Sequence, residues 1–112
     1  MTSPFNCGLE AALVVLGGKW KPLILFHLRL NTYRYGELRR AVGKVSDKVL
    51  IQQLKELQSD GVVERVDYAE IPPKVEYSLT NFGHSLAQAL VPLCEWGTQH
   101  NNELAAIARR RS

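Results

Sequence analysis

Long apolar runs, closely spaced cysteines and repeated segments are all missing from this sequence of 112 residues. No run approaches the roughly 20 apolar residues that cross a bilayer. The apolar stretch 9–16 contains Glu10 and follows no lysine or arginine, unlike a signal peptide. Cys7 and Cys94 lie far apart, as is usual for free thiols inside a cell. The sequence therefore predicts one cytoplasmic domain, residues 1–112, with no membrane partner.

Catalytic and metal-binding patterns are also missing. The sequence has no CxxC or HxxxH pair, and its three histidines are scattered. Gly17-Gly18-Lys19 lacks the features of a phosphate-binding loop, because Trp20 follows the lysine and Leu13 stands where a glycine is needed. No nucleophile stands beside a base in a recognisable frame. We therefore predict no metal, no cofactor and no enzymatic activity.

Charge is distributed unevenly along the chain, although the net charge is only +3. Residues 19–55 contain nine basic and two acidic residues, a local charge of +7, whereas residues 56–108 contain two basic and eight acidic residues, a local charge of −6. A strongly positive segment in a folded domain is typical of a surface that binds a polyanion such as nucleic acid. Scattered, solvated charge is the alternative.

The first half of the chain reads as short helices. Residues 8–16 and 19–30 have helical patterns on either side of Gly17-Gly18, and the second helix is apolar nearly all round, so it is expected to be the most buried. A short strand at residues 33–35 and a helix at residues 36–42 follow.

The next helix has two different sides. Ser46 is a good N-cap residue for it. Leucines at helical spacing form one narrow stripe, namely Leu50, Leu54 and Leu57. Long cationic and amide side chains form the opposite stripe, namely Lys48, Gln52 and Lys55. The leucines are expected to hold the helix on the core while the other stripe faces outward.

A hairpin and a long helical stretch complete the chain. Residues 62–68 and 74–79 read as strands, joined by a loop that two prolines stiffen. Residues 80–108 read as a helical stretch that starts at a Thr80 or Asn81 cap and that Pro92 should kink or split in two. The fold class is mainly α with a small antiparallel β-hairpin wing: a winged helix-turn-helix with its helix-turn-helix at about 36–60 and its wing at about 62–79.

This order of elements predicts double-stranded DNA as the partner. Lysine neutralises phosphate or contacts guanine, and glutamine pairs with adenine in the major groove. Arg39 and Arg40 are expected on backbone phosphates, and Arg65 is expected to face Lys74 across the hairpin, beside acidic residues that reduce the positive charge of the wing. The predicted DNA-binding residues are Arg39, Arg40, Ser46, Lys48, Gln52, Gln53, Lys55, Arg65 and Lys74.

The first and last helical stretches predict a homodimer. Both carry more apolar residues than a three-helix core can cover, and packing against their copies about a two-fold axis would bury the excess. The predicted interface residues are Leu9, Leu13, Leu16, Leu86, Leu90 and Leu93. A single larger core is the alternative. On the dimer reading, residues 8–16 and 80–108 are the dimerisation helices.

Several segments together closely resemble HxlR-type transcriptional regulators, bacterial winged-helix proteins related in architecture to the MarR group. They are CGLEAALVVLGGKWKPLILFHL, YRYGELRRAV, VSDKVLIQQLKELQSDGVVERVDY, PPKVEYSLTNFG and LCEWG, which span about residues 7–100. The resemblance implies a homodimer that binds operator DNA at the bacterial nucleoid. Several members also sense oxidants or electrophiles through a cysteine near the N-terminus, so the resemblance allows an electrophile or small-molecule inducer without fixing which.

Cys7 stands at that sensing position. It precedes the first helix, and a helix N-terminus favours the reactive thiolate. An inert cysteine is the alternative on sequence alone. Cys94 lies in an apolar stretch and is expected to be buried and structural.

A protein-interaction module without specific DNA binding is the main alternative function for a winged helix. Such modules rarely need a +7 segment through the helix-turn-helix, so charge favours the DNA-binding interpretation.

Overall fold

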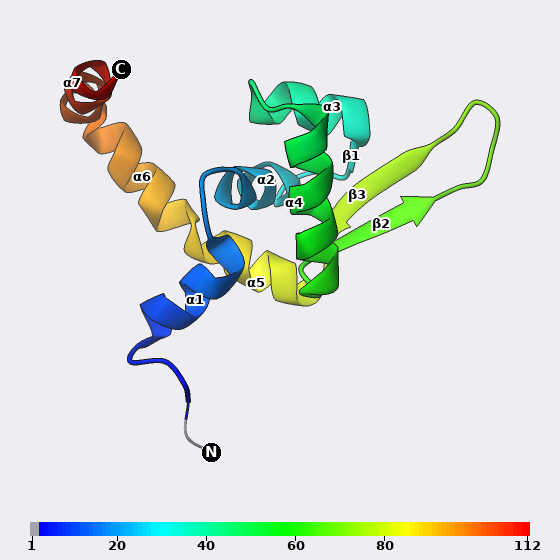
Figure 1. Ribbon diagram of the computed structural model, residues 1–112, viewed down its shortest axis with the longest axis horizontal. Helices are drawn as coiled ribbons and strands as arrows, with labels where there is room; N and C mark the ends of the chain where they lie inside the picture. The colour runs from blue at the N-terminus through cyan, green and yellow to red at the C-terminus, as the bar shows by residue number, and fades with distance from the viewer. Residues whose placement is uncertain (1–2) are drawn as a thin grey trace.

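The computed structural model describes residues 3–112, which form helices around one core and a hairpin that projects from it (Figure 1). The elements in chain order are α1 (Gly8–Leu16), α2 (Trp20–Leu28), β1 (Tyr33–Arg34), α3 (Tyr35–Val42), α4 (Asp47–Ser59), β2 (Val63–Asp67), β3 (Val75–Leu79), α5 (Asn81–Ala89), α6 (Val91–Gln99) and α7 (Asn101–Arg111). The predicted fold class, mainly α with a small antiparallel sheet, is confirmed.

Helix α2 lies at the centre of the core, as its all-round apolar sequence predicted. Ile24 and Leu25 are fully buried and Leu28 is almost so. The helix contacts α1, α3, α4, α5 and β3, so both halves of the chain pack on it. Burial of this kind is the main favourable term in folding and makes α2 the support for the elements around it.

The two glycines after α1 allow a sharp turn. Gly18 has a φ of +84°, a conformation that glycine adopts at low cost. The direction of the chain changes by 88° between α1 and α2. No single helix within residues 3–112 is long and apolar enough to cross a membrane, and α1 with α2 would pass that test only as this bent pair.

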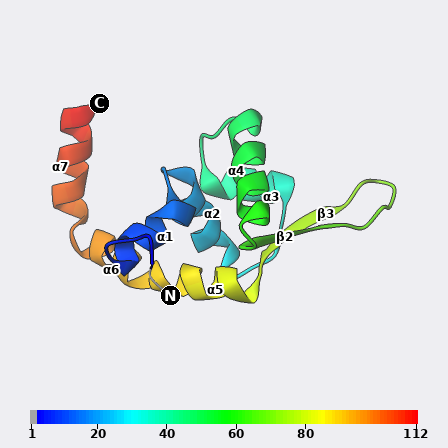
Figure 2. The same cartoon turned by 60° about the horizontal axis from the view of Figure 1, so that its bottom comes forward.

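The strands form an antiparallel sheet in the order β1-β3-β2. Alternation along β3 buries Tyr77 and Leu79, whereas β2 buries only Val63. The outer part of the hairpin therefore extends beyond the core, and both views show it projecting from the helices (Figures 1 and 2).

The start of α5 packs directly on the chain that enters β2. The hydroxyl of Thr80 accepts a hydrogen bond from the backbone N–H of Gly83 at 3.0 Å and caps the helix. A Cβ atom on Gly83 would lie 2.1 Å from the carbonyl oxygen of Val62. This approach is possible only without a side chain at residue 83.

The C-terminal helical stretch differs from its prediction of one kink or split at Pro92. Three helices are present, and the first break falls at Leu90, so that Pro92 lies in the first turn of α6, where a missing N–H costs little. The second break, at His100, was not predicted. There the carbonyl of Trp96 accepts the backbone N–H of His100 at 3.1 Å, and the imidazole Nδ1 also lies 2.9 Å from that carbonyl. Figure 2 shows α7 standing apart from the core.

Candidate nucleic-acid interface

Helix α4 presents one side to the core and the other to solvent. Its leucine stripe is buried, with Leu50, Leu54 and Leu57 each at most 1% exposed. The predicted outward stripe is exposed along its length, namely Lys48, Gln52 and Lys55. Gln53 is half-buried at the edge between these sides. The helix therefore offers three long polar side chains that the core does not use.

The start of α4 is fixed by local hydrogen bonds. The hydroxyl of Ser46 accepts the N–H of Val49 at 3.2 Å, as its predicted role as N-cap requires. The Tyr35 hydroxyl donates to an Asp47 carboxylate oxygen at 2.5 Å. Burial and this bond raise the pKa of Tyr35 to about 12, so the phenol stays protonated and keeps donating at neutral pH. These contacts tie α3 to the first turn of α4.

The two arginines of α3 have different surroundings. The Nε of Arg39 lies 3.3 Å from Asp47 Oδ1 and 3.5 Å from the carbonyl of Val45, so this side chain bridges to the turn before α4. Arg40 is exposed at the same end of α3. Arg40 is thus the better placed of the two to contact a backbone phosphate.

The hairpin register differs from the prediction that Arg65 faces Lys74. Arg65 pairs with Tyr77, because the ladder runs from Val63 opposite Leu79 and ends with Asp67 opposite Val75. Lys74 lies opposite Tyr68, beyond the last pair, and its ammonium group sits 4.4 Å from the centre of the Tyr68 ring. The two predicted wing cations therefore lie at different distances from the core.

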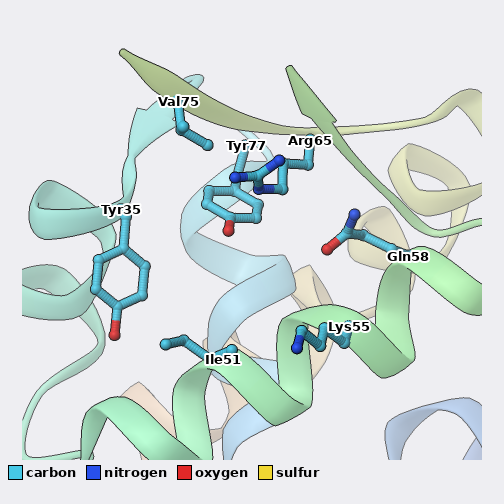
Figure 3. Close-up of a pocket in the computed structure, with 7 residues that line it drawn as sticks. All are labelled: Tyr35, Ile51, Lys55, Gln58, Arg65, Val75 and Tyr77. Atoms are coloured by element: carbon cyan, nitrogen blue, oxygen red, sulfur yellow. The ribbon is translucent and has the colours of Figure 1, made fainter. Parts of the chain in front are cut away.

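A cleft of about 460 Å³ separates α4 from the hairpin (Figure 3). Its lining comes from α3, α4, β2 and β3, namely Tyr35, Ile51, Lys55, Gln58, Arg65, Val75 and Tyr77. None of these seven described residues is acidic. Lys55 enters from the helix and Arg65 from the strand, and neither forms an ion pair with a carboxylate within residues 3–112. The cleft can therefore accept an anionic group such as a phosphate.

Tyr35 and Gln58 were not among the predicted site residues. Gln58 follows Lys55 by three residues and so shares its side of the helix, which spacing could have indicated. Tyr35 reaches the cleft through the packing of α3 against β3, which no local pattern encodes.

The two cysteines are both exposed. Cys7 is the N-cap residue of α1, as predicted. The prediction that Cys94 is buried is wrong for this chain, because α6 runs away from the core and buries none of its residues. Cys94 borders an apolar hollow of about 410 Å³ with Leu93 and Phe26. No three His, Cys, Asp or Glu side chains in the described part of the chain gather as a metal site would require.

The predicted dimer residues divide into two groups. Leu9, Leu13 and Leu93 are 70%, 53% and 63% exposed. Leu16, Leu86 and Leu90 pack into or against the core, and Leu90 is only 9% exposed. Further exposed apolar residues lie beside the first group, namely Val14 and Trp96, at 64% and 50%. The chain therefore leaves apolar surface on α1 and α6 uncovered.

A helix-turn-helix whose second helix exposes cations and an amide, followed by a hairpin with a positive cleft, defines a winged-helix DNA-binding protein. The model of the HxlR-like helix-turn-helix family matches residues 15–105. The chain belongs to this family, whose members are transcriptional regulators rather than enzymes.

Proteins that are similar to this chain in sequence or structure are described as regulators. An uncharacterized HTH-type transcriptional regulator, YtcD of Bacillus subtilis, is 47% identical over 100 residues, 89% of this chain and 79% of YtcD. The reduced form of the redox regulator HypR aligns with a TM-score of 0.81 at 39% identity, covering 89% of this chain and 99% of HypR. Diamide-treated YodB from B. subtilis aligns with a TM-score of 0.67 at 32% identity, covering 85% and 95%.

Proposed function

We propose that this transcriptional regulator binds an inverted-repeat operator in double-stranded DNA as a homodimer, and that modification of Cys7 changes its affinity. The observation that carries the proposal is the two-sided α4, with buried leucines on one side and exposed Lys48, Gln52 and Lys55 on the other. Such a helix fits the major groove, which is wide enough for an α-helix and displays base edges. Its work on the chromosome would place the protein in the cytoplasm, at the nucleoid.

Each part of the surface has a separate task in this proposal. Gln52 reads a base pair, and Lys48 contacts a guanine or a phosphate at the same groove. Lys55 and Arg65 hold one backbone phosphate between helix and hairpin, which fits the cleft that they line. Arg40 contacts the backbone beside the groove.

The homodimer follows from the uncovered apolar surface of α1 and α6. Leu9, Leu13 and Leu93 would each be removed from water by a second copy, which is favourable in proportion to the apolar area buried. A two-fold dimer presents two copies of α4, so the operator should be an inverted repeat with half-sites about one or two helical turns apart.

Selection of bound DNA from random sequence tests the proposal. We expect an inverted repeat to be enriched, and the logarithm of its binding constant to fall linearly with the logarithm of salt concentration. A pool that stays random after repeated selection would instead favour a protein-interaction module.

Substitutions on α4 should separate base contacts from phosphate contacts. We expect Gln52→Ala to relax specificity at one base pair per half-site, at a cost of ~1–3 kcal/mol for each bidentate pairing that the substitution removes. Lys55→Ala should weaken binding to all sequences more evenly, and reduce the salt slope by about one for each phosphate that is no longer neutralised. Operator affinities measured by fluorescence anisotropy at several salt concentrations check both. Unchanged binding by both variants would refute the recognition-helix assignment.

The Cys7 thiol should respond to oxidants. Cys7 is exposed at the N-cap of α1, and two similar structures are described as a redox regulator and as a diamide-treated protein. Modification there would add bulk beside a dimer helix and tilt the two copies of α4 relative to each other. We expect diamide or a quinone to change operator affinity in a gel-shift titration, and Cys7→Ser to be unresponsive.

Cys94→Ser is the control for this experiment. The Cys94→Ser variant should respond to the oxidant as the wild-type chain does, unless Cys94 is the partner thiol of Cys7. Thiol mass spectrometry must accompany the gel shift. Stoichiometric modification of Cys7 without any change in operator affinity would eliminate the sensor role.

A further inference from the structure

A lysine is buried beneath the proposed base-reading helix. Lys21 lies in the first turn of α2, and its side chain is only 9% exposed. It is the one charged residue in the buried core of residues 3–112. Its ammonium group donates to Glu56 Oε1 of α4 at 2.8 Å, so the bond joins residues 35 apart in sequence. The central helix of the core is thus tied directly to the helix that would enter the DNA groove.

The partner, Glu56, is poorly suited to a DNA-binding helix by itself. Its side chain is 44% exposed, and a free carboxylate there would repel a polyanion. The hydrogen bond from Lys21 and the positive charge of Lys21 hold the pKa of Glu56 below its usual range. The carboxylate is therefore ionised at neutral pH, and Lys21 balances its charge.

Glu56 is also next to Gln52 on the helix surface, because residues four apart lie on the same side of a helix. The Gln52 amide also lowers the pKa of the Glu56 carboxyl, by less than Lys21 does, as a neighbouring N–H donor would. Only the amide N–H₂ group can donate to a carboxylate, so a hydrogen bond between the two side chains would fix which end of the amide faces Glu56. The Gln52 carbonyl and its second N–H would then be left free for bidentate pairing with adenine.

We propose that Lys21 and Glu56 are positioning residues for DNA sequence recognition: Lys21 holds and neutralises Glu56, and Glu56 orients the amide of Gln52 toward a base pair. This inference rests on the proposed function. Neither residue touches DNA in this arrangement. The competing interpretation is that the Lys21–Glu56 pair only stabilises the fold. In that case its loss would affect stability without altering the choice among DNA sequences.

The double variant Lys21→Met/Glu56→Met tests this role. Methionine keeps the length of the aliphatic stem, and replacing both members of the pair leaves no charge buried without a partner at residue 21, so the variant should fold. The readout is a discrimination ratio: affinity for the selected operator divided by affinity for the operator changed at the Gln52 base pair. We expect this ratio to fall about tenfold. A folded double variant with an unchanged ratio would overturn the proposal.

Two further comparisons make the outcome specific. In a Gln52→Ala background the double substitution should have no further effect on the discrimination ratio, because the side chain that Glu56 would position is already gone. A further tenfold fall of the ratio in that background would refute positioning through Gln52. Lys19→Met is the matched control, since it removes a nearby lysine whose ammonium group lies over Trp20 rather than on a carboxylate. It should keep the ratio. If the wild-type chain selects no operator, the proposed function itself is refuted. That result is distinct from an unchanged ratio in the double variant, which would refute only the positioning role.

Discussion

Gly83→Ala is expected to destabilise the protein by about 3 kcal/mol or more, which is at the upper end for overpacking a core. The added Cβ would lie 2.1 Å from the carbonyl oxygen of Val62 and 3.1 Å from its carbonyl carbon. Both are backbone atoms, so no side chain can rotate out of the way. Either α5 or the start of β2 must shift, which would also disturb the hydrogen bond from Thr80 N–H to that oxygen.

Thermal and urea unfolding, followed by circular dichroism, would measure this destabilisation. A change of about 3 kcal/mol corresponds to a fall in melting temperature of roughly 10 °C for a domain of this size. Gly36→Ala is the matched control, because its Cβ would meet only the flexible end of Arg40 at an ordinary 3.6 Å. It lies in helix α3 and should be neutral or slightly stabilising. Equal stability of the Gly83 and Gly36 variants would contradict the close approach of α5 to β2.

Leu93→Glu is expected to give folded monomers that bind the operator about 10²- to 10⁴-fold more weakly than the dimer. Leu93 is 63% exposed in the protomer, so a charge there leaves the core intact. In the proposed dimer the same charge would be buried without a partner, which is strongly unfavourable. A monomer can occupy only one half-site, so it lacks the gain in effective concentration that a linked pair provides.

Analytical ultracentrifugation at micromolar concentration and operator titration measure the two effects. Leu90→Glu is an informative companion, because Leu90 is only 9% exposed and a charge there should unfold the protomer instead. Circular dichroism separates the two outcomes. The dimer interface would be misassigned if the unmodified chain sediments only as a 12.6 kDa species, or if Leu93→Glu stays dimeric.

Local patterns predicted much of this molecule. Ser46 and the leucines of α4 encode a cap and a buried side within one segment of chain, and the structure has both. The break at His100 was missed because it depends on a hydrogen bond and on stacking with Trp96, whose ring centre lies 4.7 Å from that of His100. The burial of Cys94 was misjudged because periodicity shows that a helix is apolar but not what covers it.

Contacts between distant segments were beyond the reach of sequence reasoning. The register that places Arg65 opposite Tyr77 is set by which residue of each strand enters the core. The ion pair between Lys21 and Glu56 joins α2 to α4, and it could not be predicted before the fold had placed these two helices side by side. The cleft between Lys55 and Arg65 likewise exists only once the hairpin is placed beside α4.

The division of α4 into a leucine side and an outward side affects how the family can evolve. Lys48, Gln52 and Lys55 contribute nothing to the core, so a mutation at any of them leaves the fold nearly as stable as before. After gene duplication, one copy could acquire a new DNA preference through a few such mutations while remaining folded at every step. Relatives that share the buried leucines could in this way come to control unrelated genes.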